Sequence, residues 1–393
     1  MMITVTMTAM LLSQASLPSL KLQDQNFVDP TGKQVQLRGV NLGGWLVEEI
    51  WMTPVKKDPP AGSSFKEVKD HVSLWSTIEK RLGKDSMLRV RQAWRDNWIT
   101  EADFKRIKDL GLNHVRVPFL YHLIDEPNGM DWLKKSVAWA KKNGLYVVLD
   151  LHGVPGGQSG EHHTGQDGQN KLWSETENIG KTEEYWKKVA REFRSEPTVA
   201  AYDLINEPMG APNPAMLAVV YHRLITAIRT VDKDKPVIID DGYKGFETTP
   251  HANIGGWTQT AYSLHFYNFE AKSSADHVKG LKDKLPKVKE LQGYRNAPLY
   301  IGEFNLEPHG NAQVMKEYLA ELDKANLNWA LWTYKTIAPG GPMGQWGIFS
   351  APGPVEPLNP FLDTEAQMIE KLKSVRTEKI RIAPGLENAF KKS

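Results

Sequence analysis

Eight short apolar runs, each followed by a helix-like segment, constrain the fold of this chain more than any other feature. Strand and helix signals that alternate in this way are typical of an α/β protein with a parallel sheet. Eight units favour closure into a single (β/α)8 TIM barrel, and 393 residues are enough for one. Periodicity alone leaves an open, doubly wound sheet as the alternative. The runs cover residues 37–42, 114–119, 146–152, 199–206, 236–241, 262–268, 298–304 and 328–334.

The segments between the runs have the periodicity of helices. Thr100 can cap a helix that ends at Gly111 and has Phe104, Ile107 and Leu110 on its apolar face. The other expected helices cover residues 132–142, a run that starts at Thr182, and residues 216–231, 276–291, 312–325 and 364–375.

Two elaborations are added to the expected barrel. Residues 26–28 and 34–37 flank the sequence Asp29-Pro30-Thr31-Gly32-Lys33, which predicts an N-terminal β-hairpin with a Pro/Gly turn. The long segment 44–99, between the first and second strands, is expected to contain helices around 66–80 and 86–98. Residues 20–393 would then form one catalytic domain.

The first 19 residues carry little charge, and Met10-Leu11-Leu12 is followed by small residues. This pattern predicts a signal peptide, and a disordered N-terminus is the alternative. We therefore expect a secreted or periplasmic protein.

Composition excludes several classes of function. The net charge of +2 gives no general attraction to nucleic acid or an anionic membrane. The absence of cysteine excludes disulfides, thiolate metal sites and cysteine nucleophiles. No later run is apolar for long enough to span a bilayer. We expect a monomer without nucleic-acid or membrane partners.

Two glutamates lie where strand-like runs give way to loops. Glu207 follows Ile205-Asn206, and Glu303 lies in the run 298–304. A carboxylate is costly to bury without a partner, so two of them at strand ends indicate a site that uses a carboxylate pair. The chemistry that most needs such a pair is cleavage of a glycosidic bond.

Other polar and aromatic residues fall at the ends of the same runs, where barrel enzymes place their chemistry. They are Arg116, His152, His265, Tyr267 and Trp332. His265 and Tyr267 are two residues apart, so they are expected to face the same way.

Tryptophan is frequent, with 13 residues, and its flat ring suits the C–H faces of sugars. Five tryptophans in or near expected top loops are candidates to extend a cleft: Trp45, Trp51, Trp173, Trp257 and Trp346. Three others fit helical patterns and are expected to pack in the core: Trp132, Trp139 and Trp186.

A metal site is the competing interpretation of the histidines. His152 with His162 and His163 would supply zinc ligands, but their spacing matches no helical His-x-x-x-His pattern. We therefore expect no metal and no other cofactor.

The chain resembles glycoside hydrolase family 5, a family of retaining glycosidases, from about residue 37 to 370. The first stretch and the regions around Trp75 and 93–104 are most similar to the fungal exo-β-1,3-glucanase branch. Seven stretches carry the resemblance, in this order: Arg38–Leu46, Val115–Pro118, Leu149–Gly153, Leu204–Pro208, His265–Tyr267, Ile301–Phe304 and Leu331–Lys335.

The resemblance implies a role for each residue at the site. Glu303 would be the nucleophile, kept ionised by Arg116, and Glu207 the acid/base, kept protonated by partial burial and by the negative field of Glu303. Tyr267 would orient Glu303. The remaining sugar contacts would come from Asn206 at the 2-hydroxyl, from His152 and His265, and from Trp332 as a stacking platform.

The branch also places an acidic residue shortly after Gly-Gly-Trp-Leu, where it binds the terminal sugar. Glu49 takes that position, with Glu48 beside it, and a pocket closed by both would favour exo action. Where the branch has a phenylalanine pair, this chain has Gly160-Glu161-His162-His163 and Phe269-Glu270.

The expected function is therefore a retaining glycoside hydrolase that acts on a β-glucan or a gluco-oligosaccharide. The linkage, β-1,4 or β-1,3, and the choice between endo and exo cleavage stay open. The alternatives are a non-catalytic β-glucan-binding barrel and a β-mannanase of the same family.

Overall fold

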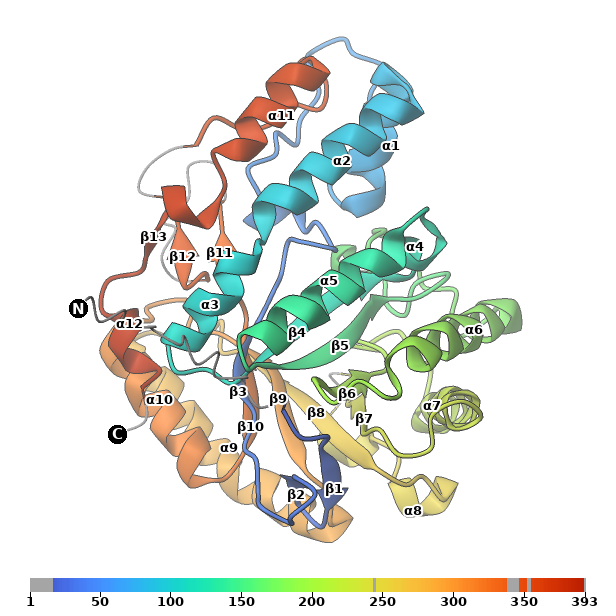
Figure 1. The fold of residues 1–393 in the computed structure, drawn as a ribbon, viewed down its shortest axis with the longest axis vertical. Helices are drawn as coiled ribbons and strands as arrows, with labels where there is room; N and C mark the ends of the chain where they lie inside the picture. The colour runs from blue at the N-terminus through green and yellow to red at the C-terminus, as the bar shows by residue number, and fades with distance from the viewer. Residues whose placement is uncertain (1–16, 243–244, 338–345, 352–354, 392–393) are drawn as a thin grey trace, which may run out of the picture.

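A closed barrel of eight parallel strands forms the centre of the molecule (Figure 1). The computed structural model describes residues 17–242, 245–337, 346–351 and 355–391. The last strand pairs with the first through Trp329 and Arg38, which confirms the barrel and excludes an open sheet. The barrel strands are β3 (Arg38–Asn41), β4 (His114–Leu120), β5 (Tyr146–Gly153), β6 (Val199–Asp203), β7 (Val237–Asp240), β8 (Thr260–Phe266), β9 (Leu299–Phe304) and β10 (Asn328–Leu331).

Helices surround the barrel at the expected places in the chain. Thr100 and Asp103 form a reciprocal capping box at the start of α3, as the N-cap prediction requires. One helix begins earlier than predicted, at Thr176 instead of Thr182. The helices are α3 (Glu101–Asp109), α4 (Tyr121–Asp125), α5 (Gly129–Lys142), α6 (Thr176–Phe193), α7 (Pro214–Arg229), α8 (Ala252–Gly255), α9 (Ser274–Arg295), α10 (Ala312–Lys324), α11 (Glu365–Lys373) and α12 (Leu386–Ala389).

The N-terminal hairpin differs from the prediction. Strand β2 (Asn26–Val28) pairs with β1 (Lys21–Gln23), and residues 34–37 contribute only an isolated bridge from Gln34 to Val28. The chain turns away because Leu37 donates its amide to the Asn328 side chain at 2.9 Å and enters the barrel. Leu20, Phe27 and Leu37 pack against residues at the amino ends of the barrel strands. The hairpin thus covers one end, and the carboxyl end is left for a site.

The inserted segment 44–99 contains a one-turn helix, η1 (Ile50–Met52), and the helices α1 (His71–Leu82) and α2 (Lys84–Trp98). These helices lie beside α11 and extend the molecule at one end (Figure 1). Trp94 and Trp98 stack with ring centres 5.3 Å apart, and their indole nitrogens donate to Gly44 and Gly43. The insertion is therefore fixed to the loop that follows β3.

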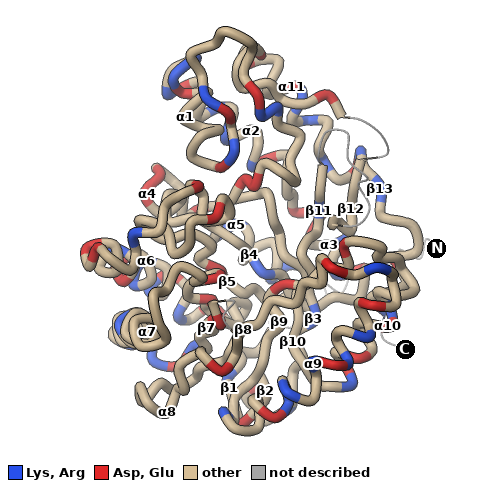
Figure 2. Tube along the Cα trace, turned by 180° about the vertical axis from the view of Figure 1, so that it is seen from behind, with Lys and Arg blue, Asp and Glu red and all other residues tan. Residues whose placement is uncertain are grey.

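Three short strands form a separate sheet that the sequence pattern did not predict: β11 (Lys335–Thr336), β12 (Phe349–Ser350) and β13 (Arg381–Ile382). Further single turns are η2 (His162–Thr164), η3 (Phe246–Thr248) and η4 (Thr377–Lys379). Basic and acidic residues are intermixed along the outer helices (Figure 2). Within the described ranges, no helix has the length and apolar character that a membrane span requires.

Candidate active site

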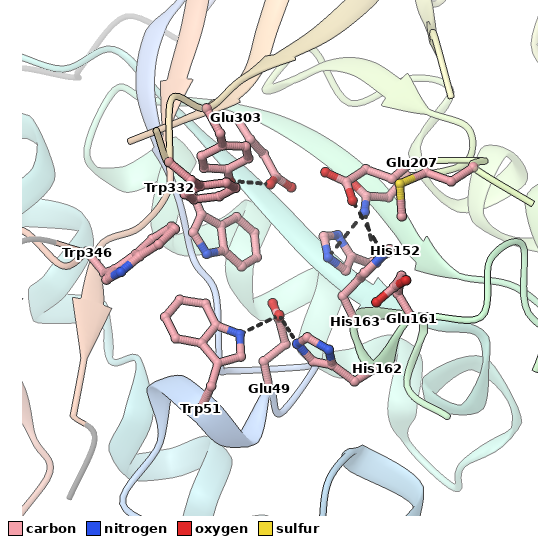
Figure 3. Close-up of a pocket in the computed structure, with 14 residues that line it drawn as sticks. Glu49, Trp51, His152, Glu161, His162, His163, Glu207, Glu303, Trp332 and Trp346 are labelled. Carbon is pink, nitrogen blue, oxygen red and sulfur yellow. Dashed lines mark hydrogen bonds and ion pairs between the residues drawn. The ribbon is translucent and has the colours of Figure 1, made fainter. Parts of the chain in front are cut away.

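A cavity of about 340 Å³ opens at the carboxyl end of the barrel (Figure 3). Glu207 and Glu303 face each other across it. A carboxylate oxygen of Glu207 lies within 4.8 Å of a carboxylate oxygen of Glu303. Glu207 lies in the segment that follows β6, and Glu303 lies in β9, a strand that is not a neighbour of β6 in the barrel. The cavity is lined by Glu49, Trp51, His152, Glu161, His162, His163, Asn206, Glu207, Met209, Tyr267, Phe269, Glu303, Trp332 and Trp346.

Glu303 is held by two fixed donors. Arg116 Nη1 donates to Oε1 at 2.9 Å, and the Tyr267 hydroxyl donates to Oε2 at 2.7 Å. The residue is 4% exposed. Burial raises the pKa of Glu303, and the nearby charges of His265 and Arg116 oppose that rise without cancelling it. Both oxygens are therefore positioned before a substrate arrives.

Arg116 connects the carboxylates under the site. Its guanidinium donates to Asp203 at 2.9 Å and lies 3.2 Å from Asp150. It also donates to the Asn206 side-chain oxygen at 2.9 Å. Burial lowers the pKa of Arg116, but the surrounding carboxylates raise it above its ordinary value, so the charge is permanent. A fully buried cation with these partners can orient Glu303 and Asn206 together.

Glu207 follows β6 in a left-handed backbone conformation, with φ of 43°. Its amide donates to Asp240 Oδ2 at 2.9 Å. Its two oxygens contact different histidines, because His265 Nδ1 lies 2.6 Å from Oε1 and His163 Nε2 lies 3.3 Å from Oε2. This conformation is uncommon for a residue with a side chain, and it directs the carboxylate into the cavity.

The expected electrostatic state of Glu207 is wrong for the free protein. Burial raises its pKa, but the hydrogen bond from His265 and the charge of His163 lower the pKa to about 2. Burial lowers the pKa of His265, but Glu303, Asp240 and Glu207 raise it to about 10. Both shifts favour the proton on the His265 imidazole over the Glu207 carboxyl.

Asn206 and His152 are held by partners that the sequence pattern did not reveal. Gln158 donates to the Asn206 carbonyl at 2.8 Å, and Asp150 lies 2.7 Å from His152 Nδ1. The Asn206 amide nitrogen lies 3.4 Å from both His152 Nε2 and His163 Nδ1. Asp240 carries the same signal as Glu207, a carboxylate at the end of an apolar run, and Asp150 is a carboxylate inside such a run, so the sequence could have identified both.

Aromatic rings form one wall of the cavity. Trp332 stacks on the His152 ring at 5.5 Å, and Trp346 meets Trp51 edge-on at 5.0 Å. Tyr267 stacks on Phe269 at 5.2 Å, and Phe269 is 58% exposed at the rim. Trp51, Trp332 and Trp346 therefore lie where the sequence placed them.

Three other tryptophans do not extend the cleft. Trp45 is fully buried and stacks on Trp139, a packing role like that expected for Trp132, Trp139 and Trp186. Trp173 donates inward to the Gln158 carbonyl, and Trp257 donates to His222. Trp45 and Trp173 pack beneath the loops at the carboxyl end, and Trp257 precedes the amino end of β8 instead of lying in a top loop.

Glu49 lies on the side of the cavity opposite the glutamate pair (Figure 3). Its Oε2 accepts from Trp51 Nε1 at 2.8 Å and lies 3.3 Å from His162 Nε2, which raises the pKa of His162. Its Oε1 is buried and has no hydrogen-bond partner among the described residues. Glu48 does not close the pocket as expected, because it points to His71 and is fully buried there.

The structure does not gather His152, His162 and His163 into a metal-ligand set. Each contacts a different acid: Asp150, Glu49 and Glu207, respectively. Among the described residues, the group whose ligand atoms converge is Glu207, His265 and Glu303. Those atoms are already hydrogen-bonded to one another or to Tyr267 and Arg116.

Known proteins resemble this chain over most of its length. A family model described as "Cellulase (glycosyl hydrolase family 5)" matches residues 76–336. "Probable glucan 1,3-beta-glucosidase A" of Aspergillus clavatus is 30% identical over 86% of this chain and 92% of its own. The Aspergillus niger protein of the same name is 28% identical over 78% and 85%. The crystal structure of rutinosidase from Aspergillus niger has a similar fold, with a TM-score of 0.61, 19% identity and coverage of 79% and 93%.

Proposed function

Because the chain belongs to glycosyl hydrolase family 5, the cellulase family, we propose that Glu207 and Glu303 cleave the β-glucosidic bonds of a β-glucan. The chain is a glycoside hydrolase, and the retaining double displacement typical of the family describes its reaction. The residue roles given below belong to the proposal.

The observation that carries the proposal is the separation of the two carboxylates. Retaining glycosidases have carboxyl groups roughly 5–5.5 Å apart, and inverting enzymes need about 6.5–9.5 Å to admit a water. One oxygen of Glu207 lies within 4.8 Å of one oxygen of Glu303, which supports direct attack by a nucleophile.

In the first step, Glu303 attacks the anomeric carbon and the bond to the leaving oxygen breaks. Glu303 is suited to this role because Arg116 and Tyr267 fix both of its oxygens. Glu207 delivers a proton to the leaving oxygen. A bound sugar displaces water from Glu207 and raises its pKa, so the proton held by His265 can pass to it across the 2.6 Å contact.

In the second step, water attacks the glycosyl-enzyme and gives its proton to Glu207. The ester at Glu303 is uncharged, so Glu207 no longer faces a negative neighbour and acts as the base. Hydrolysis of the ester restores the Glu303 carboxylate. The proton on Glu207 then passes back to His265, and the resting state is recovered.

The cavity walls supply the sugar contacts of the proposal. Asn206, oriented by Arg116 and Gln158, is placed to bind the 2-hydroxyl. Trp332 offers a ring face for stacking. The Oε1 of Glu49 has no partner among the residues that the structure describes, and a hydroxyl of a terminal sugar provides the donor that it needs.

We propose exo cleavage of β-1,3-glucan, because Glu49, Trp51 and His162 line one side of the cavity and the two Aspergillus relatives reported above are named glucan 1,3-β-glucosidases. Laminarin should release glucose from the first minutes, and carboxymethyl cellulose should be a poor substrate. Chromatography of the products over time checks this. A ladder of oligomers from laminarin would show endo cleavage instead. The monomeric state and the export by residues 1–19 stay predictions.

The nucleophile assignment is tested by chemical rescue. Glu303→Ala should abolish turnover, and azide should restore it with an activated aryl β-glucoside, giving the α-glucosyl azide. Product configuration is measured by NMR. Turnover of the unrescued variant at the rate of the unmodified enzyme would remove the assignment.

A further inference from the structure

Asp240, at the end of β7, contacts both the backbone and the hydrogen-bond partner of Glu207. The Glu207 amide donates to its Oδ2 at 2.9 Å, and the same oxygen lies 3.7 Å from His265 Nε2. His265 Nδ1 lies 2.6 Å from Glu207 Oε1. The imidazole therefore bridges two carboxylates, with Asp240 on one side and Glu207 on the other.

The charge of Asp240 has few other partners. The residue is 2% exposed, and its Oδ1 has no hydrogen-bond partner among the described residues. Arg116, the permanent cation nearby, pairs with Asp150, Asp203 and Glu303 instead. Within the described ranges, His265 is the ion-pair partner of Asp240. The charge of Asp240 also acts on Arg116 and Asp203, but among the described residues its ion-pair contact is with His265.

Asp240 also stabilises the backbone conformation of Glu207. A left-handed conformation at a residue with a side chain is strained and persists where surrounding contacts hold it. The hydrogen bond from the Glu207 amide to Asp240 is such a contact. One side chain thus fixes the direction of the Glu207 carboxylate and the orientation of the imidazole.

We propose that Asp240 is a positioning residue that keeps a proton on His265 for delivery through Glu207. The proposal rests on the acid/base role of Glu207. The proton leaves His265 Nδ1 for Glu207 Oε1 and then reaches the leaving oxygen. The neutral imidazole keeps its Nε2 proton toward Asp240. The proton taken from water in the second step returns by the same route, so the cycle balances.

Several charged groups surround His265 and set when it loses its proton. Three of them are carboxylates, Glu207, Asp240 and Glu303, and they favour the imidazolium. Removing the charge of Asp240 leaves two carboxylates beside His265, so the imidazolium should lose its proton at a lower pH. The other titratable groups that face this cluster are Arg116, His152, His163, Asp203, Tyr221 and Tyr267, as far as the described residues go.

The test is the pH dependence of kcat/KM for Asp240→Asn. Asparagine keeps an oxygen for the Glu207 amide and removes the charge. The basic limb should move down by roughly one pH unit. Turnover of an alkyl β-glucoside, which needs an acid, should fall on the order of tenfold, and an activated aryl β-glucoside should lose much less. Asp241→Asn, one residue further along, is the matched control and should leave the basic limb unchanged.

An unshifted basic limb in folded Asp240→Asn would overturn the proposal, since Asp240 would then only accept the hydrogen bond from the Glu207 backbone amide. Should that variant not fold, 15N NMR of His265 in the unmodified enzyme decides the question. An imidazolium at pH 8 is expected, and a neutral ring at pH 7 would contradict the proposal.

Glu207→Ala, measured in parallel, separates this proposal from the assigned function. It should lose turnover of the alkyl glucoside and keep its first step on the activated substrate. If Glu207→Ala behaves in this way and Asp240→Asn does not shift the basic limb, then only the proposal that Asp240 keeps a proton on His265 is wrong. If Glu207→Ala keeps full turnover of both substrates, the acid/base assignment fails first.

Discussion

At the scale of single residues, two identical side chains differ through their partners. Glu303 has one oxygen against an arginine and the other against a tyrosine hydroxyl, and these contacts fix a nucleophile. Glu207 has both oxygens against histidines, which can give and take protons. Two carboxylates in different surroundings can thus perform different chemistry within one cavity.

Tyr267→Phe tests how Glu303 is held. The change removes a donor 2.7 Å from Oε2, and a hydrogen bond to a charged group contributes roughly 1.5–3 kcal/mol. We expect kcat/KM to fall about 10–100-fold. Because the lost bond favoured the carboxylate, the pKa of Glu303 should rise and the acid limb of the pH profile should move up. A fall in rate with an unmoved acid limb would mean that Tyr267 contacts only the sugar.

The sequence predicted the residues of this site better than their partners. Glu207 and Glu303 stand at or near the ends of apolar runs and Arg116 lies inside one, where a polar side chain has no packing role. Asp240 stands at such an end too, but its use depends on the distance to His265, which no spacing along the chain reveals. His163 was weighed only as a metal ligand, an interpretation that its spacing disfavoured, and its contact with Glu207 was missed because it joins segments that are far apart in sequence.

At the scale of elements, the segment between β3 and β4 both extends the barrel and builds the closed side of the cavity. Glu49 and Trp51 lie in it, just before α1 and α2. Trp98 anchors α2 to Gly43, and a Cβ on Gly44 would lie 2.8 Å from the Trp98 ring, so only glycine fits there. The position of Glu49 therefore depends on helices that do not touch a sugar.

Trp98→Ala tests this dependence. The ring is fully buried and stacked on Trp94, and its removal should lower the free energy of unfolding by about 3–5 kcal/mol. Urea denaturation measures the change, and KM for the terminal sugar should rise because Glu49 loses support. Arg89→Ala is the control, because its ion pair with Glu365 also joins α2 to another helix but is exposed. Equal decreases in the free energy of unfolding of the two variants would contradict the anchoring role of Trp98.

The main elements could be predicted because each barrel strand is a buried apolar run and each helix has one apolar face. The strand ends were less accurate. Residues 204–206 continue an apolar run, yet β6 stops at Asp203, because the chain must turn there to point Glu207 inward. The sheet of β11, β12 and β13 was missed because strands of two residues carry no periodicity.

At the scale of the whole molecule, closure of the barrel sets the geometry of the reaction. Glu207 follows β6 and Glu303 lies in β9, and β7 and β8 separate these two strands. His265 from β8 lies 2.6 Å from Glu207 and 3.5 Å from Glu303. The hairpin β1–β2 covers the amino end, so solvent and substrate reach the pair from the carboxyl end. The short carboxylate separation is thus a property of the closed sheet.

The most direct test of this account is the anomeric configuration of the first sugar released. Hydrolysis of an aryl β-glucoside, followed by proton NMR before mutarotation, should show β-glucose first, with the α-anomer appearing only later. That result requires two displacements at one carbon and a nucleophile in contact with it. Initial release of α-glucose would mean that water attacks directly, and it would contradict the assignment of Glu303 as the nucleophile.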